Sequence, residues 1–202
     1  MDLLDVTQGL STVGYSVFPD FLLAADMEEL SRESDTLRIQ GNFRRGGIGQ
    51  GEHRRVNDAE RQDEICWMDP LALSAPQIAL WARLEALREA VDQALWLGLW
   101  SLEGHYSVYP PGGFYHRHRD SFRHDDARIL SAVIYLNGPW LPEDGGELRL
   151  FPRGLAAVDV APTGGSLVCF LSHEMEHEVR RSQRARKSFA CWFARRGLDG
   201  TA

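Results

Sequence analysis

Apolar residues recur at helical spacing in two stretches of the first half of the chain. In the first stretch Asp20 is a candidate N-cap, and Phe21, Leu23, Met27 and Leu30 would share one helical face. The spacing therefore predicts a helix that begins at about residue 20.

A second helix is predicted from Ser74 and Pro76, which together form a helix-start signal. Gly98 and Gly104 bracket its expected end. Its apolar positions recur every three or four residues and are Ile78, Trp81, Leu84, Leu87, Val91 and Leu95. Upstream of both helices, residues 11–17 are typical of a short strand.

The pattern changes at about residue 105. Short runs of β-branched and aromatic residues now alternate with Pro- and Gly-rich turns at residues 110–113, 142–146 and 162–165. The runs are HYSVY, RILSAVIYL, GELRLF, SLVCFL and SFACWF. Successive strands without intervening helices predict a sandwich or barrel. We expect an α+β chain whose core is an eight-stranded jelly roll, a cupin-like double-stranded β-helix, buttressed by the N-terminal helices.

The expected organisation is a single domain over residues 1–202, with helical support in 1–99 and the jelly-roll core in 100–197. Between the helices, residues 41–62 contain five glycines between Gly41 and Gly51, together with several arginines. For most of this segment we favour a flexible connector, and the functional alternative is a mobile lid over an active site. It lacks the GK[ST] ending of a phosphate-binding loop.

Charge, cysteine number and hydropathy argue against several classes of protein. The formal net charge of −7 argues against nonspecific binding of nucleic acid. The cysteines Cys66, Cys169 and Cys191 are too few for a disulfide framework, so we expect free thiols in a reducing compartment. Neither a secretory signal nor an apolar run of membrane-spanning length is present. We therefore expect a cytoplasmic protein without a membrane partner and do not favour a nucleic-acid partner. We also expect a monomer.

The candidate chemistry centres on His118 and Asp120, which form a His-x-Asp pair, and on the distant His177. Residues two apart on a strand point to the same side, and a His from another strand can complete a triangle. Two imidazoles and one carboxylate hold Fe(II) on one face and leave the opposite face open for a chelating cosubstrate and dioxygen. The order of these residues predicts an oxygen-activating enzyme.

The cosubstrate would be 2-oxoglutarate, whose keto acid end chelates the metal. Arg186 offers a planar fork for the far carboxylate, while Ser188 and Tyr135 offer hydroxyls. The charges of Fe(II), Asp120, the dianion and Arg186 sum to zero, which limits the cost of burying the site.

Three other histidine patterns are alternative candidates for a metal site. A second His-x-Asp at residues 124–126 lies in a polar stretch and is better explained as a solvated turn. His116 is expected at the pocket rim. Residues 173–177, HEMEH, match the HExxH pattern of zinc metallopeptidases, but that pattern needs a helix and here follows a β run. Two alternatives remain: that His118, Asp120 and His177 are unrelated polar residues, and that the chain is a binding module that kept the barrel and lost the chemistry, against which the intact triad argues.

The chain resembles the prolyl 4-hydroxylase branch of the Fe(II)- and 2-oxoglutarate-dependent dioxygenases, and especially the oxygen-sensing prolyl hydroxylases and their bacterial relatives. The likeness covers about residues 60–195. It rests on the segments YPPGGFYHRHRD, RILSAVIYLN, DGGELRLFP and HEVRRSQRARKSFACWF, preceded by Arg61-x-Asp63-x-Ile65-x-Trp67.

The resemblance implies iron ligation by His118, Asp120 and His177, and binding of the far carboxylate of 2-oxoglutarate by Arg186 and Tyr135. It implies hydroxylation at C4 of a prolyl residue, with succinate and carbon dioxide as products and ascorbate as the supporting reductant. The bacterial relatives suggest a cytosolic protein target, for which a translation elongation factor of the EF-Tu type is a candidate. The alternative substrate for the same chemistry is alkylated nucleic acid.

Further roles follow from the same resemblance. Tyr109 would line the cosubstrate pocket, and Trp192 would shape the site at a position where nucleic-acid dealkylases usually carry a second Arg. Arg128 and Asp63 match positions near the peptide substrate, where we expect them to pair. The segment 41–62 would close over the bound prolyl segment.

Overall fold

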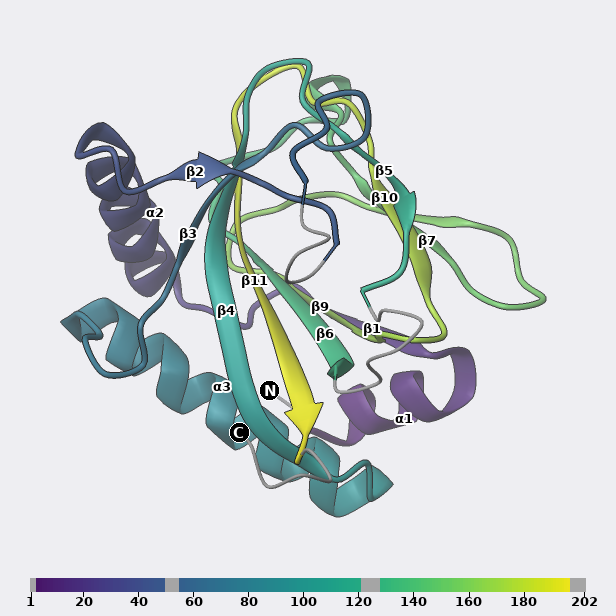
Figure 1. Ribbon diagram of the computed structural model, residues 1–202. Coiled ribbons are helices and arrows are strands. Elements are labelled where there is room, and N and C mark those ends of the chain that lie inside the picture. The colour runs from purple at the N-terminus through teal and green to yellow at the C-terminus, as the bar shows by residue number, and fades with distance from the viewer. Residues whose placement is uncertain (1–2, 50–54, 121–127, 197–202) are drawn as a thin grey trace.

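The computed structural model describes residues 3–49, 55–120 and 128–196. Two antiparallel sheets face each other, and three helices lie on the outer side of the larger one (Figure 1). The helices are α1 (Leu3–Val13), α2 (Ala24–Ile39) and α3 (Ala75–Leu95). The strands are β1 (Tyr15–Phe18), β2 (Arg44–Arg45), β3 (Glu64–Trp67), β4 (Leu99–Tyr109), β5 (Tyr115–His118), β6 (Arg128–Tyr135), β7 (Leu148–Phe151), β8 (Val158–Val160), β9 (Leu167–Leu171), β10 (Glu176–Val179) and β11 (Arg186–Arg195). A short 3-10 helix spans Pro142–Asp144.

The core is the predicted double-stranded β-helix. The larger sheet has the order β1-β9-β6-β11-β4-β3-β2, and the smaller sheet has the order β5-β10-β7-β8. The strands from β4 to β11 are thus shared equally between the two sheets, which is the expected eight-stranded jelly roll. Strands β1, β2 and β3 extend the larger sheet at its edges.

Helix α3 packs its apolar face on the larger sheet, with Leu80, Leu84, Leu87 and Val91 almost completely buried. Its start is as predicted, because Ser74 and Gln77 form a reciprocal capping box. Ile78, expected on the apolar face, is instead 57% exposed. Gln77 takes the buried position because its amide donates to Glu33 of α2.

Several predicted boundaries are wrong. Helix α2 begins at Ala24 with Leu23 as its N-cap, because the Leu22 N–H is bonded to the Gly165 carbonyl and keeps the chain extended past Asp20. Residues 11–13 belong to α1, and the strand begins only after Gly14, whose φ of +79° breaks the helix. Gly104 lies within β4 rather than at a helix end, and an added Cβ there would collide with Phe189.

The described parts of the segment 41–62 are not a flexible connector. Arg44 and Arg45 in β2 pair with β3, while residues 60–62 pair with the edge of β5 through His116 N–H to Glu60 O at 2.9 Å and Gln62 N–H to Phe114 O at 3.0 Å. The chain therefore crosses here from the edge of the smaller sheet to the larger one. Residues 50–54 of the predicted lid lie outside the described residues. Among the described helices, none is long and apolar enough to span a membrane.

Candidate metal centre and cosubstrate pocket

The cluster of His118, Asp120 and His177 lies between strands β5 and β10. These strands pair with His177 directly opposite His118, and Asp120 follows two residues after His118. One ligand atom from each residue lies within 4.8 Å of the others. Oδ1 of Asp120 is 3.6 Å from Nε2 of each imidazole. The fold thus brings together the three residues that the sequence proposed as a metal-binding triangle.

Backbone carbonyls orient both rings. Nδ1 of His118 is 2.7 Å from the His116 carbonyl, and Nδ1 of His177 is 3.2 Å from the Met175 carbonyl. Since a carbonyl only accepts, each Nδ1 carries the proton, and each Nε2 lone pair is directed to the centre of the cluster.

The charge states also suit a divalent ion. Burial, with His118 beside it, lowers the pKa of His177 to about 4, so that this imidazole is neutral at pH 7. Burial alone would raise the pKa of Asp120, but the neighbouring His177 and His118 hold it well below its usual range. Two nitrogen donors and one carboxylate on one side of a cavity fit Fe(II).

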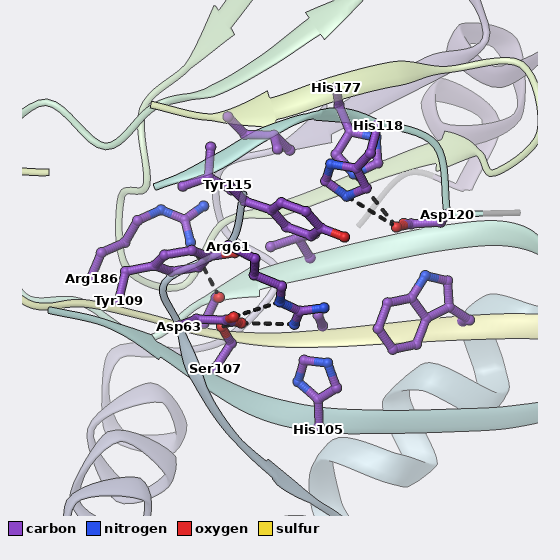
Figure 2. Close-up of a pocket in the computed structure, with 16 residues that line it drawn as sticks. Arg61, Asp63, His105, Ser107, Tyr109, Tyr115, His118, Asp120, His177 and Arg186 are labelled. Carbon is purple, nitrogen blue, oxygen red and sulfur yellow. Dashed lines mark hydrogen bonds and ion pairs between the residues drawn. The ribbon is translucent and has the colours of Figure 1, made fainter. Parts of the chain in front are cut away.

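The cavity continues from the metal cluster to Arg186 at the start of β11 (Figure 2). Arg186 is 1% exposed, and its Nε donates to the Gly146 carbonyl at 2.8 Å. No carboxylate among the described residues pairs with it. The Tyr135 hydroxyl is buried without a hydrogen-bond partner in the described part of the chain, and the Arg186 guanidinium lies 5.0 Å from the Tyr135 ring.

A buried cation beside a buried hydroxyl that lacks a partner is unfavourable unless an anion satisfies both. Nη1 of Arg186 lies 3.4 Å from Ser188 Oγ, and its guanidinium lies 5.2 Å from the Tyr109 ring. Arg186, Ser188 and Tyr109 therefore line one end of the cavity, and Tyr135 lies beside Arg186 without itself lining the cavity. The donor set at this end fits the far carboxylate of 2-oxoglutarate.

Polar residues on the opposite wall form a second cluster. Asp63 accepts hydrogen bonds from Nε and Nη2 of Arg61, at 2.5 and 2.8 Å, and from Ser107 Oγ at 2.7 Å. Burial alone would raise the pKa of Asp63, but Arg61 holds it below its usual value. The expected pairing of Asp63 with Arg128 is therefore wrong, because Arg61 already occupies the carboxylate. Arg128 instead pairs with Glu103 at 2.7 Å and lies 3.9 Å above the Trp192 ring.

Among the residues of the cavity that the sequence did not single out, His105 and Tyr115 are the two with aromatic rings. His105 is buried between Trp67 and Trp192, with ring centroids 4.8 and 5.3 Å away, and burial lowers its pKa to about 4. Tyr115 stacks on His118 with the ring centroids 3.6 Å apart. His105 belongs to the alternating row of β4 that includes Ser107 and Tyr109, so strand periodicity was the signal that could have revealed it.

The competing patterns do not form sites in the described structure. His173 lies in a turn after β9 and its side chain is 48% exposed, while His177 lies in a strand, so the HExxH interpretation is wrong. His116 is exposed and packs against Phe114, outside the cavity lining. The second His-x-Asp at residues 124–126 lies outside the described residues.

Gly46 lies directly over the Arg61–Asp63 pair, and its N–H donates to the Asp63 carbonyl at 2.8 Å. A Cβ at this position would overlap the Asp63 carboxylate and the Arg61 guanidinium. We expect Gly46→Ala to displace the adjoining segment, lowering the free energy of unfolding by about 1–3 kcal/mol and speeding amide exchange at Gly46 and Ile48. Urea denaturation and hydrogen exchange measure both effects. Gly138→Ala is the matched control, since nothing lies near its added Cβ; equal effects in both variants would refute the steric argument.

Comparisons with known proteins agree with this geometry. Residues 104–194 match the family model of the 2OG-Fe(II) oxygenase superfamily. A prolyl-4-hydroxylase from Pseudomonas putida is 39% identical, with a TM-score of 0.88, and the match covers 96% of this chain and 100% of that one. A prolyl hydroxylase from Trichoplax adhaerens, solved in complex with a peptide fragment of the hypoxia inducible factor oxygen degradation domain, is 25% identical with a TM-score of 0.86, covering 95% and 88% of the two chains.

A viral collagen prolyl hydroxylase from Paramecium bursaria Chlorella virus-1, solved with 2OG, is 13% identical, with a TM-score of 0.65 and coverage of 92% and 98%, and shows the shared fold alone. The Pseudomonas match extends over essentially the whole of both chains. The chain belongs to the prolyl 4-hydroxylase family of the 2OG-Fe(II) oxygenases.

Proposed function

We propose that this oxygenase hydroxylates C4 of a prolyl residue in a protein substrate and converts 2-oxoglutarate to succinate and carbon dioxide. The observation that carries the proposal is the joint placement of two sites in one cavity. The His118, Asp120 and His177 cluster lies at one end, and Arg186 lies at the other, next to Tyr135, whose hydroxyl has no hydrogen-bond partner among the described residues. This is the arrangement that a bound keto acid, chelating a metal and paired at its far carboxylate, requires.

Separate groups of residues would bind the metal and orient the cosubstrate. His118, Asp120 and His177 would hold Fe(II), which with dioxygen and 2-oxoglutarate supplies the oxidising chemistry. Arg186, Tyr135, Ser188 and Tyr109 would fix the orientation of the cosubstrate. The low pKa of His177, caused first by burial, keeps its Nε2 free of a proton at neutral pH and available to a metal.

The peptide would enter beside His105 and Trp192, which line the cavity and pack with Trp67, and these rings would offer an apolar surface to a prolyl ring. Asp63 and Arg128 flank this surface from opposite ends. The prolyl hydroxylase from Trichoplax adhaerens was solved in complex with a peptide fragment, which supports a protein substrate here. We propose that the segment 41–62 closes over that peptide.

The proposal also covers the domain organisation, oligomeric state, location, reductant and target of the enzyme. We propose a single domain over residues 1–202 that acts as a monomer in the cytoplasm, which fits the free thiols of Cys66, Cys169 and Cys191. Ascorbate would maintain the ferrous state, a translation elongation factor of the EF-Tu type is a candidate target, and a role in oxygen sensing would follow if turnover is limited by dioxygen.

The direct test is incubation of the purified protein with Fe(II), 2-oxoglutarate, ascorbate and a peptide pool from a cytosolic digest. Succinate release together with a gain of one oxygen on proline, located by fragmentation mass spectrometry, is the expected result. A parallel arm contains alkylated oligonucleotides. Dealkylation there, with no oxidised proline in the peptide arm, would replace the proposed substrate class with nucleic acid.

A further inference from the structure

The carboxylate of Asp120 has two oxygens in different surroundings. Oδ1 faces the metal cluster, 3.6 Å from each imidazole Nε2. Oδ2 accepts a hydrogen bond from Ser131 Oγ at 2.7 Å, and Ser131 Oγ lies 2.8 Å from Ser172 Oγ. Ser131 belongs to β6 and Ser172 follows β9, both in the larger sheet, whereas Asp120 follows β5 of the smaller sheet.

The hydrogen bonds that link Ser172, Ser131 and Asp120 allow only one arrangement of the hydroxyl protons. An ionised carboxylate only accepts, so the Ser131 hydroxyl must donate to Asp120. Its single proton is then committed, and the contact between the two serines requires Ser172 to donate to Ser131. Both serines are essentially buried, at 1% and 0% exposure, so water does not compete for these hydrogen bonds. Successive hydrogen bonds of this kind strengthen each other in a low-dielectric interior.

We propose that Ser131, supported by Ser172, is a positioning residue that holds Oδ2 of Asp120 away from the metal, so that Asp120 ligates through Oδ1 alone. The inference rests on the proposed function and specifies how this chain keeps its metal site open. Neither serine lines the cavity that would hold 2-oxoglutarate, so both would act only through Asp120.

The consequence follows from the number of coordination positions. Two imidazoles and a monodentate carboxylate leave half of an octahedral sphere open, which is enough for a chelating keto acid and dioxygen. If both oxygens of Asp120 bound, the keto acid would fill the remaining positions, and dioxygen would have none. The hydrogen bond from Ser131 thus protects the position that the reaction with dioxygen needs.

The test uses Mn(II) as a probe in full-length protein. In Ser131→Ala we expect Mn(II) affinity within about threefold of wild type, because the freed oxygen replaces a water ligand. Water-proton relaxation at saturating Mn(II), which reports metal-bound water, should fall by about a third as three open positions become two. Turnover of 2-oxoglutarate should fall about 10- to 100-fold. Ser131→Thr retains the hydroxyl and should restore water-proton relaxation and turnover to wild-type values.

Further variants separate positioning from folding. Ser172→Ala should have a smaller effect in the same direction, and no added effect in the Ser131→Ala background, because it acts through Ser131. Ser166→Ala removes another buried hydroxyl, bonded to the Thr163 carbonyl, and should change neither relaxation nor turnover. Wild-type relaxation in Ser131→Ala, or a loss of Mn(II) affinity with unchanged relaxation per bound ion, would overturn the inference. Failure of the wild-type protein to bind Mn(II) would instead refute the proposed function.

Discussion

Replacement of His177 by alanine is expected to reduce 2-oxoglutarate turnover to background and to weaken Mn(II) binding by more than about 100-fold. The loss exceeds the 10- to 100-fold effect of outer-shell changes because a ligand itself disappears. His177 is 5% exposed, and its Nε2 faces Oδ1 of Asp120 at 3.6 Å, so no side chain among the described residues can take its place. Isothermal titration with Mn(II) and a succinate assay measure the two effects.

The matched control is His173→Ala, which alters the other histidine of the same HEMEH segment. His173 is half-exposed and contacts Glu174 rather than the metal cluster, so activity and Mn(II) affinity should stay within about twofold of wild type. The opposite ranking of the two variants would mean that the ligand assignment is wrong. The His177 ring also packs against Phe170, with the ring centroids 4.6 Å apart, so its removal could affect folding. Thermal unfolding of both variants shows whether His177→Ala remains folded.

Arg186→Lys is expected to raise the KM for 2-oxoglutarate about 10- to 100-fold, with Mn(II) affinity nearly unchanged. A hydrogen bond to a charged group contributes about 1.5–3 kcal/mol, and lysine cannot reproduce the planar fork that faces Tyr135 and Ser188. Retaining the positive charge limits the cost of the change to folding. Steady-state kinetics over a range of 2-oxoglutarate concentrations gives the KM.

Arg184→Lys is the control for this substitution, because Arg184 lies two residues earlier on the surface, with its side chain 49% exposed near Asp144. Its KM should equal that of wild type. If Arg186→Lys left the KM for 2-oxoglutarate unchanged, the far carboxylate would have to bind elsewhere in the cavity.

Local rules predicted much of the jelly roll. The alternation of β-branched runs and Pro- or Gly-rich turns after residue 105 indicated strands that became β4, β6, β7, β9 and β11. The His-x-Asp spacing also predicted that His118 and Asp120 share one side. The placement of His177 opposite His118 depends on the register of β5 and β10, which no local pattern specifies.

The parts that the sequence did not reveal depend on tertiary contacts. Helix α2 begins late because Leu22 is bonded to Gly165, which lies far along the chain. Asp63 pairs with Arg61 because both line the same cavity, whereas Arg128 pairs with Glu103 outside its lining. Tyr115 was missed because its stacking on His118 comes from the bulged end of β5, where strict alternation fails.

The most direct test of the account is anaerobic addition of 2-oxoglutarate to the Fe(II)-loaded protein, followed by visible absorption. The cluster of His118, Asp120 and His177 with Arg186 in the same cavity predicts a charge-transfer band that saturates at one 2-oxoglutarate per chain. The band should be absent in Asp120→Ala. A wild-type protein that binds Fe(II) but develops no band, or an Asp120→Ala protein that develops the same band, would contradict the assignment of this cavity.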